Sequence, residues 1–136
     1  MIFKEGKSYG ISAAGNLQTL LLLNGTEFEL KLTDKILFIE EDESINESLF
    51  RRYLTQLMAM REFSKLKGLV ISKFTNESSI SKEQLINILS EYNLDSFNFP
   101  IVTNINSGHC DPIVTIPINR RCNLDAQNNS VRIIFE

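Results

Sequence analysis

Two patterns of hydrophobic residues follow each other along this chain. Some segments are short, continuous apolar runs, and others have apolar residues at helical spacing. Residues 35–40 and 68–74 contain continuous apolar runs, which are typical of strands buried on both faces of a sheet. Residues 46–63 have apolar side chains at helical spacing, and residues 17–23 and 81–92 indicate two further helices. The pattern therefore predicts buried strands that alternate with helices.

The helix ends have their own signals. Asn16 is placed to cap the first helix, and Asn24-Gly25 is placed to stop it. Ser81 and Gln84 have the spacing of a capping box at the start of the third helix. These polar residues make the helix starts more definite than the apolar pattern alone.

The last part of the chain is expected to be mostly β. Residues 98–103 predict a strand in which Pro100 marks an edge or a bend. Residues 113–116 and 131–135 predict further strands, with a turn at residues 127–129. Residues 1–136 are thus expected to form a single α/β domain with parallel strands and an added antiparallel part.

Composition and charge narrow the function classes. The apolar fraction of 43% and the charged fraction of 23% are typical of globular proteins. A net charge of −3 without a Lys/Arg stripe argues against nucleic acid. No apolar segment is long enough for a membrane span or a secretory signal. We therefore expect a cytoplasmic protein that binds neither nucleic acid nor membrane, with Cys110 and Cys122 as free thiols.

Two segments contain groups suited to catalysis. Glu40 ends a buried strand, and His109, the one histidine of the chain, follows a later strand. Because functional groups gather beyond the carboxyl ends of parallel strands, we expect these side chains to meet. A carboxylate there would fix the tautomer of the histidine, which is well suited to accept a proton at neutral pH.

Other interpretations of these residues stay open from spacing alone. A run of acidic residues after a strand is more often a solvated turn, and a lone histidine after glycine is more often an ordinary loop residue. No metal-binding spacing such as HxH, HExxH or DxD accompanies them, so we expect no metal and no cofactor. Cys110 is adjacent to His109, whereas the partners of a nucleophilic dyad usually come from separate segments.

Several segments resemble the motifs of one known family, in the same order along the chain. Residues 15–17 with residues 24–26 resemble its "G-G-N-L … G-T" stretch, and residues 36–41 resemble its "I-L-F-L-E-D" strand. Residues 52–57 are similar to its "R-x-L-x-Q-L" helix, and residues 68–74 resemble "G-I-I-L-G-K-F".

The resemblance continues through the second half of the chain. Residues 100–118 resemble "P-V … G-H … P … T-x-P-I-G", and residues 124–126 resemble an "L-D-A" before the last strand. The chain as a whole resembles the C-terminal domain of the LD-carboxypeptidase and microcin-immunity serine peptidases, which include muramoyltetrapeptide carboxypeptidases. The "T-x-P-I" and "L-D-A" motifs lean toward the microcin-immunity branch.

This resemblance implies a fold, a site and partners. The family's C-terminal domain is of the swivelling β/β/α type, so we expect a mixed sheet with two main helices. Its Ser-Glu-His site lies between this domain and an N-terminal domain that bears the serine nucleophile. Carried over by residue, Glu40 matches the orienting glutamate and His109 the general base, with Glu41 as the alternative carboxylate. The implied substrates are murein L,D-peptides or microcin-like peptide-nucleotide amides, and relatives pair as homodimers.

The chain also departs from the family pattern. No serine stands in a Gly-x-Ser elbow, so we expect the nucleophile domain to be absent and the chain to be inert alone. Asn119 replaces a glycine where the backbone turn calls for a positive φ.

Two hypotheses follow. The first is the C-terminal part of a cytoplasmic serine carboxypeptidase. The alternative is a stand-alone, non-enzymatic binding or interaction module of the same fold. The presence of both Glu40 and His109 favours the first, since an interaction module need not keep both.

Overall fold

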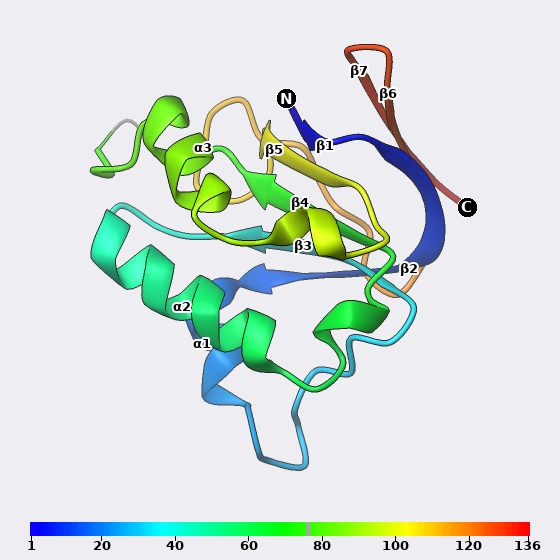
Figure 1. The fold of residues 1–136 in the computed structure, drawn as a ribbon, viewed down its shortest axis with the longest axis horizontal. Helices are drawn as coiled ribbons and strands as arrows, with labels where there is room; N and C mark the ends of the chain where they lie inside the picture. The colour runs from blue at the N-terminus through cyan, green and yellow to red at the C-terminus, as the bar shows by residue number, and fades with distance from the viewer. Residues whose placement is uncertain (76) are drawn as a thin grey trace.

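The computed structural model describes residues 1–75 and 77–136, which form a seven-stranded mixed sheet with helices packed on it (Figure 1). The strands are β1 Ile2–Lys4, β2 Gly6–Asn16, β3 Lys35–Glu40, β4 Gly68–Ser72, β5 Ile101–Ile105, β6 Arg121–Gln127 and β7 Ser130–Phe135. The α-helices of the described residues are α1 Leu17–Leu22, α2 Glu47–Ala59 and α3 Lys82–Ser90. Short 3-10 turns cover Phe63–Lys65 and Leu94–Ser96.

The sheet combines a parallel centre with antiparallel edges. Its strand order is β1-β5-β4-β3-β2-β6-β7. Strands β2, β3, β4 and β5 run parallel, whereas β1, β6 and β7 pair antiparallel with their neighbours. In Figure 1, β2 curves away from the parallel strands toward the β6–β7 hairpin. The expected α/β fold, a mixed sheet with two main helices, is confirmed.

Strand β3 is buried on both faces, as its apolar run predicts. Leu37 and Ile39 belong to the core between the sheet and the helices. Ile36 and Phe38 belong to a second core that the curled sheet closes with β6 and β7. The ring of Phe38 lies 6.0 Å from that of Phe135 on β7. The period-2 alternation of a strand thus divides one apolar run between two cores.

The predicted helix starts are confirmed. The side chain of Asn16 accepts a hydrogen bond from the backbone N–H of Thr19 at the start of α1. Ser81 and Gln84 form the expected capping box at the start of α3. These bonds satisfy N–H groups that have no partner within the helix.

Helix α2 is shorter than predicted. It ends at Ala59, and not near Phe63, because Met60 adopts an extended backbone. The following Glu62 then accepts hydrogen bonds from the backbone N–H groups of Leu32 and Thr33. Phe63 packs edge-on against other rings in the core. The segment after α2 therefore contacts the loop before β3 in place of continuing the helix. The apolar periodicity of the sequence does not reveal this contact.

Other strand predictions were partly wrong. Residues 113–116 form no strand, since they run irregularly between Pro112 and Pro117. Strands β1, β2 and β6 were not predicted. Strand β4 ends at Ser72, two residues before the predicted end. Strand β5 begins after Pro100, as the bend predicted there requires.

Two turn predictions are confirmed. Asn119 has a φ of 59°, as expected where the family pattern has glycine. Asn128 and Asn129 also have positive φ, and they connect β6 to β7. A positive φ at both central residues is the geometry of a tight hairpin turn.

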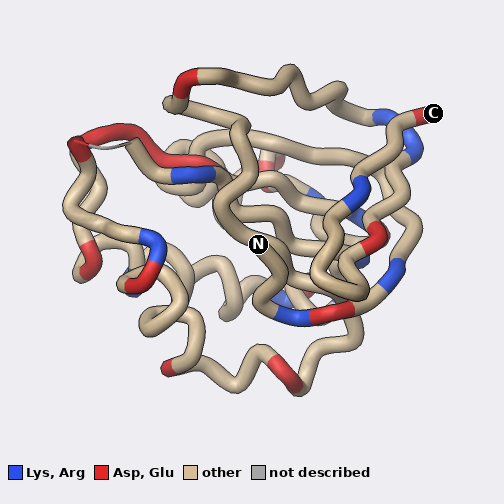
Figure 2. The backbone as a smooth tube through the Cα atoms, turned by 90° about the horizontal axis from the view of Figure 1, so that it is seen from above, with Lys and Arg blue, Asp and Glu red and all other residues tan. Residues whose placement is uncertain are grey.

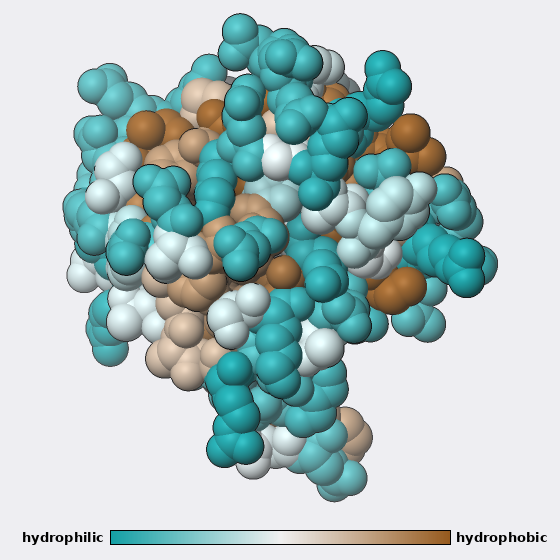
Figure 3. Space-filling model, turned by 45° about the vertical axis from the view of Figure 1, so that its right-hand side comes forward, coloured by the Kyte–Doolittle hydropathy of each residue, from teal (hydrophilic) through white to brown (hydrophobic). Residues whose placement is uncertain are grey.

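The surface is mixed in character. On the face shown in Figure 3, hydrophilic side chains cover most of the area and apolar patches lie between them. Among residues 1–75 and 77–136, none of the helices has the length and apolar character needed to cross a bilayer.

Candidate active site

Glu40 and His109 lie together at the carboxyl end of the parallel strands. Glu40 is the last residue of β3, and His109 lies in the loop that follows β5. The His109 Nδ1 atom lies 2.5 Å from the Glu40 Oε2 atom. The side chain of His109 is 54% exposed, whereas that of Glu40 is 17% exposed. The structure therefore brings together the two side chains that the sequence expected to meet.

The contact sets the protonation of the histidine. The hydrogen bond to Glu40 is the main cause that raises the pKa of His109 above its ordinary value, and the charge of Glu40 adds to it. Asp42 and Glu43 raise this pKa further, while burial opposes the shift. An ionised carboxylate can only accept, so Nδ1 donates to Glu40 and Nε2 is left free for proton transfer.

Glu41 has a different role. It is only 3% exposed, and its carboxylate accepts hydrogen bonds from the backbone N–H of Gln18 at 2.9 Å and from Asn16 Nδ2 at 3.1 Å. Burial is the main cause that raises its pKa. Glu41 therefore holds the start of α1, and Glu40 is the carboxylate that faces His109.

Acidic residues continue beyond this pair. Glu40, Glu41, Asp42 and Glu43 are consecutive, and they form the longest red stretch of the tube in Figure 2. Asp42 caps its own turn by accepting from the N–H and hydroxyl of Ser44. The negative charges of Glu40, Asp42 and Glu43 stabilise a protonated His109.

The loop before His109 is shaped by Gly108 and Ser107. Gly108 has a φ of 93°, a conformation that disfavours residues with a Cβ atom. Ser107 is buried, and its hydroxyl lies 2.6 Å from that of Ser72 at the end of β4. No signal in the sequence indicated this pair of serines.

A cavity of about 570 Å³ opens beside the pair. Phe38 and four apolar residues of the 113–118 segment line it together with Glu40 and His109; those four are Ile113, Val114, Ile116 and Ile118. Ile113 and Ile118 are more than half exposed. The apolar segment that was expected to be a strand is instead the wall of this cavity.

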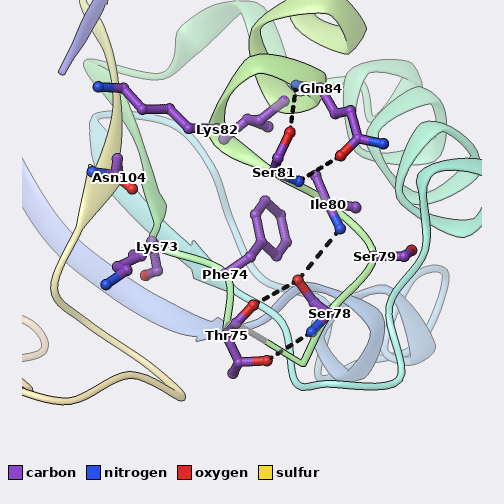
Figure 4. A pocket seen from close by; sticks show the side chains of 12 residues that line it. Lys73, Phe74, Thr75, Ser78, Ser79, Ile80, Ser81, Lys82, Gln84 and Asn104 are labelled. Atoms are coloured by element: carbon purple, nitrogen blue, oxygen red, sulfur yellow. Dashed lines mark hydrogen bonds between the residues drawn. The ribbon is translucent and has the colours of Figure 1, made fainter.

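A second cavity, of about 410 Å³, lies between the end of β4 and the start of α3 (Figure 4). Its hydroxyl groups already have partners, because Ser81 is bonded to Gln84 and Ser78 to Thr75. We therefore assign it no ligand. Over the described parts of the chain, His, Cys, Asp and Glu side chains form no group of three that could hold a metal ion.

The chain matches a family model along most of its length. The model describes the LD-carboxypeptidase C-terminal domain and matches residues 9–124. The chain belongs to this family. The resemblance expected from the sequence motifs is thus confirmed.

Individual relatives agree with this assignment. The chain is 35% identical over 133 residues to the putative carboxypeptidase YocD of Bacillus subtilis, covering 98% of this chain and 41% of that protein. An MccF-like protein from Bacillus anthracis has a similar structure, with a TM-score of 0.88 at 34% identity over 98% of this chain and 41% of the other.

Two more distant structures bear names that describe a reaction or a ligand. A muramoyltetrapeptide carboxypeptidase from Oxalobacter formigenes has a TM-score of 0.81 at 25% identity, covering 96% of this chain and 45% of its own. MccF in complex with glutamyl sulfamoyl guanosine has a TM-score of 0.83 at 26% identity, covering 99% and 40%. The chain spans about two fifths of the length of the curated relatives it matches.

Proposed function

We propose that Glu40 and His109 are two members of the Ser-Glu-His site of a serine carboxypeptidase. The nucleophilic serine would come from an N-terminal domain, which corresponds to part of the relatives' length that this chain does not match. The observation that carries the proposal is the 2.5 Å contact between His109 Nδ1 and Glu40 Oε2. The membership of the chain in the LD-carboxypeptidase C-terminal family supports it.

In the proposed reaction, Glu40 orients the histidine and His109 transfers the proton. Glu40 holds the imidazole by Nδ1 and stabilises the imidazolium that forms during the reaction. Nε2 of the exposed His109 takes the proton of the serine hydroxyl as its oxygen attacks the scissile carbonyl. The same proton then passes to the departing amine, which breaks the C–N bond and leaves an acyl-enzyme for water to hydrolyse.

The substrate class that we propose is an amide near the free carboxyl end of a peptide. The two named relatives, a muramoyltetrapeptide carboxypeptidase and an MccF bound to glutamyl sulfamoyl guanosine, support murein L,D-peptides and peptide-nucleotide amides respectively. Murein-peptide recycling and antibiotic inactivation would both place the protein in the cytoplasm. Free thiols at Cys110 and Cys122 are consistent with that compartment.

The experiment is to fuse the chain behind the N-terminal domain of the Bacillus subtilis relative and to assay both substrate classes. We expect hydrolysis by the fused protein, a loss of at least about 10³-fold in kcat for His109→Ala, and a large loss for Glu40→Gln. Glu83→Gln, at an exposed glutamate on α3, is the matched control and should retain activity.

Two outcomes would contradict the proposal. Equal activity in the fusion and its His109→Ala variant would remove His109 from the mechanism. A folded fusion that hydrolyses neither substrate class would favour the stand-alone binding or interaction module.

A further inference from the structure

The loop that carries His109 is fastened to the sheet by two buried hydroxyl groups. Ser72 is the last residue of β4, and Ser107 lies two residues before His109. Their Oγ atoms are 2.6 Å apart, and the residues are only 3% and 4% exposed. Because both residues are buried, water competes little with this hydrogen bond, and the bond holds the loop to the sheet.

The position of this pair connects it to Glu40 and His109. Both serines line the cavity that also contains Glu40 and His109. Strand β4 is the parallel neighbour of β3, so Ser72 lies beside the strand end that carries Glu40. The loop is therefore joined by side chains to two adjacent strands, through Ser107 to β4 and through His109 to β3.

The remaining bonds of the loop are mostly local. The backbone N–H of Ser107 donates to the carbonyl of Ile105, and that of Cys110 donates to the carbonyl of Gly108. Such short-range bonds shape the turn. At the base of the loop, the backbone N–H of Lys73, just after β4, donates to the carbonyl of Ile105. Farther along the loop, the side chains of Ser107 and His109 connect it to the neighbouring strands. Gly108, with its positive φ, adds conformational freedom between Ser107 and His109.

We propose that the Ser72–Ser107 pair positions His109 on Glu40. The family motif that residues 68–74 resemble has glycine where this chain has Ser72, so the motif itself does not include this hydroxyl. The two hydroxyl groups bond each other and transfer no proton in our proposed reaction, so the pair acts through His109. Its catalytic consequence rests on the proposed function, but its effect on His109 does not.

The chemistry of two hydroxyl groups separates this role from simple stabilisation. One serine donates and the other accepts, so removal of either one leaves a buried hydroxyl without its partner. Removal of both leaves no orphaned group. The double replacement Ser72→Ala with Ser107→Ala should therefore recover part of the lost stability, while the loop stays without its fastening.

The test is the titration of His109 by NMR in the 136-residue chain. His109 is the one histidine of the sequence, so its ring signal needs no further assignment. The acidic groups that raise its pKa are Glu40, Asp42 and Glu43. Lys73, Glu77 and Asp111 line a separate cavity that His109 also borders. None of these charges changes in the serine variants, so a change in the titration reports the position of His109.

We expect Ser107→Ala, Ser72→Ala and the double variant each to weaken proton binding by His109 by about threefold, because the imidazole spends less time on Glu40. Ser12→Ala is the matched control, since it removes a hydroxyl that is equally buried but bonded to Pro117 and Arg120. It should lower stability without a change in the titration of His109.

The proposal is overturned if the variants lose stability but titrate as the parent does. It is also overturned if the double variant, with stability recovered, regains the parent titration. Should Ser107→Ala fail to fold, Ser72→Ala carries the test, because its hydroxyl belongs to a strand and not to the loop. Glu40→Gln removes the partner charge of His109 altogether, so its effect on the His109 titration is the largest that the serine variants could produce. None of these readings depends on activity, so they stay separate from a failure of the proposed reaction.

Discussion

Gly108 and Glu40 approach each other so closely that a side chain at position 108 would collide with the carboxylate residue. A Cβ atom built on Gly108 would lie 2.5 Å from the Cβ and 2.9 Å from the Oε2 atom of Glu40. The Cβ of Glu40 is fixed to the backbone of β3, so it cannot turn away as the end of a flexible side chain could. The backbone of the loop rests directly on Glu40, and only glycine permits it.

Gly108→Ala should therefore disturb both stability and His109. The positive φ and the collision should together cost at least about 1–3 kcal/mol in the free energy of unfolding, and the displaced loop should lower the pKa of His109. Urea denaturation and NMR titration measure the two effects. Gly25→Ala is the control, because Gly25 has a φ of +76° and nothing within 4 Å of an added Cβ. If Gly25→Ala moved the His109 titration as much, the collision would not be the cause.

Glu40→Gln should lower the pKa of His109 and change how stability depends on pH. A histidine whose folded pKa is raised contributes stability below its unfolded pKa, about 6.5, and loses that contribution as the pH rises through the folded pKa. The stability difference between parent and variant should thus be larger at about pH 5.5 than at about pH 9. Unfolding measured at both pH values tests this, and a difference that grows with pH would contradict the ion pair.

Glu41→Ala should lower the stability of the fold without changing the titration of His109. Loss of the buried carboxylate leaves the N–H of Gln18 without its partner, which should cost about 1–3 kcal/mol in the free energy of unfolding. The titration of His109 should stay unchanged, since Glu41 faces α1. Glu40→Ala is the reciprocal control. A shifted His109 titration in Glu41→Ala would mean that both carboxylates act on the histidine.

The 136-residue chain by itself should be folded and catalytically inert. It has an ordered core but no serine in a nucleophile elbow. Circular dichroism and cooperative unfolding test the first statement. Assays with an L,D-tetrapeptide and with an aminoacyl sulfamoyl nucleotide test the second. Hydrolysis above the level of the His109→Ala chain would show that a nucleophile exists within these residues.

The same chain should self-associate through the apolar rim of the cavity beside His109. Ile113, Val114 and Ile118 are 63%, 55% and 62% exposed there, and a symmetric dimer is the commonest way to cover such a surface. Light scattering should show a mass that rises with concentration, and Ile113→Asp with Ile118→Asp should restore the monomer. A parent chain that stays monomeric at high concentration would instead favour the stand-alone module.

Much of the fold could be predicted because its signals are local. The apolar run of β3 and the caps at Asn16 and Ser81 depend on neighbouring residues only. Strand β2 could not be found in this way, since Gly6–Asn16 is rich in glycine, serine and alanine. It becomes a strand because β3 and β6 pair with it on either side.

The candidate site could be predicted from the sequence only as far as the strand topology determines which residues lie close together. Parallel strands bring their carboxyl ends to one edge, which was enough to expect Glu40 near His109. The choice between Glu40 and Glu41 depends on which way each side chain points where β3 ends at Glu40 and the chain continues into Glu41, and the sequence left it open. The Ser72–Ser107 pair joins residues 35 positions apart, so no local pattern reveals it.

The alternation along β3 also limits how this protein can evolve. Glu40 meets the histidine loop on one face, and Glu41 meets the start of α1 on the other. Because successive strand residues point to opposite faces, a one-residue insertion or deletion within the strand would exchange the two neighbours. Glu41, which now accepts a hydrogen bond from the backbone N–H of Gln18, would then face His109. Glu40 would be turned toward the start of α1. We expect homologous genes to vary freely in the loops around this strand while its length stays constant.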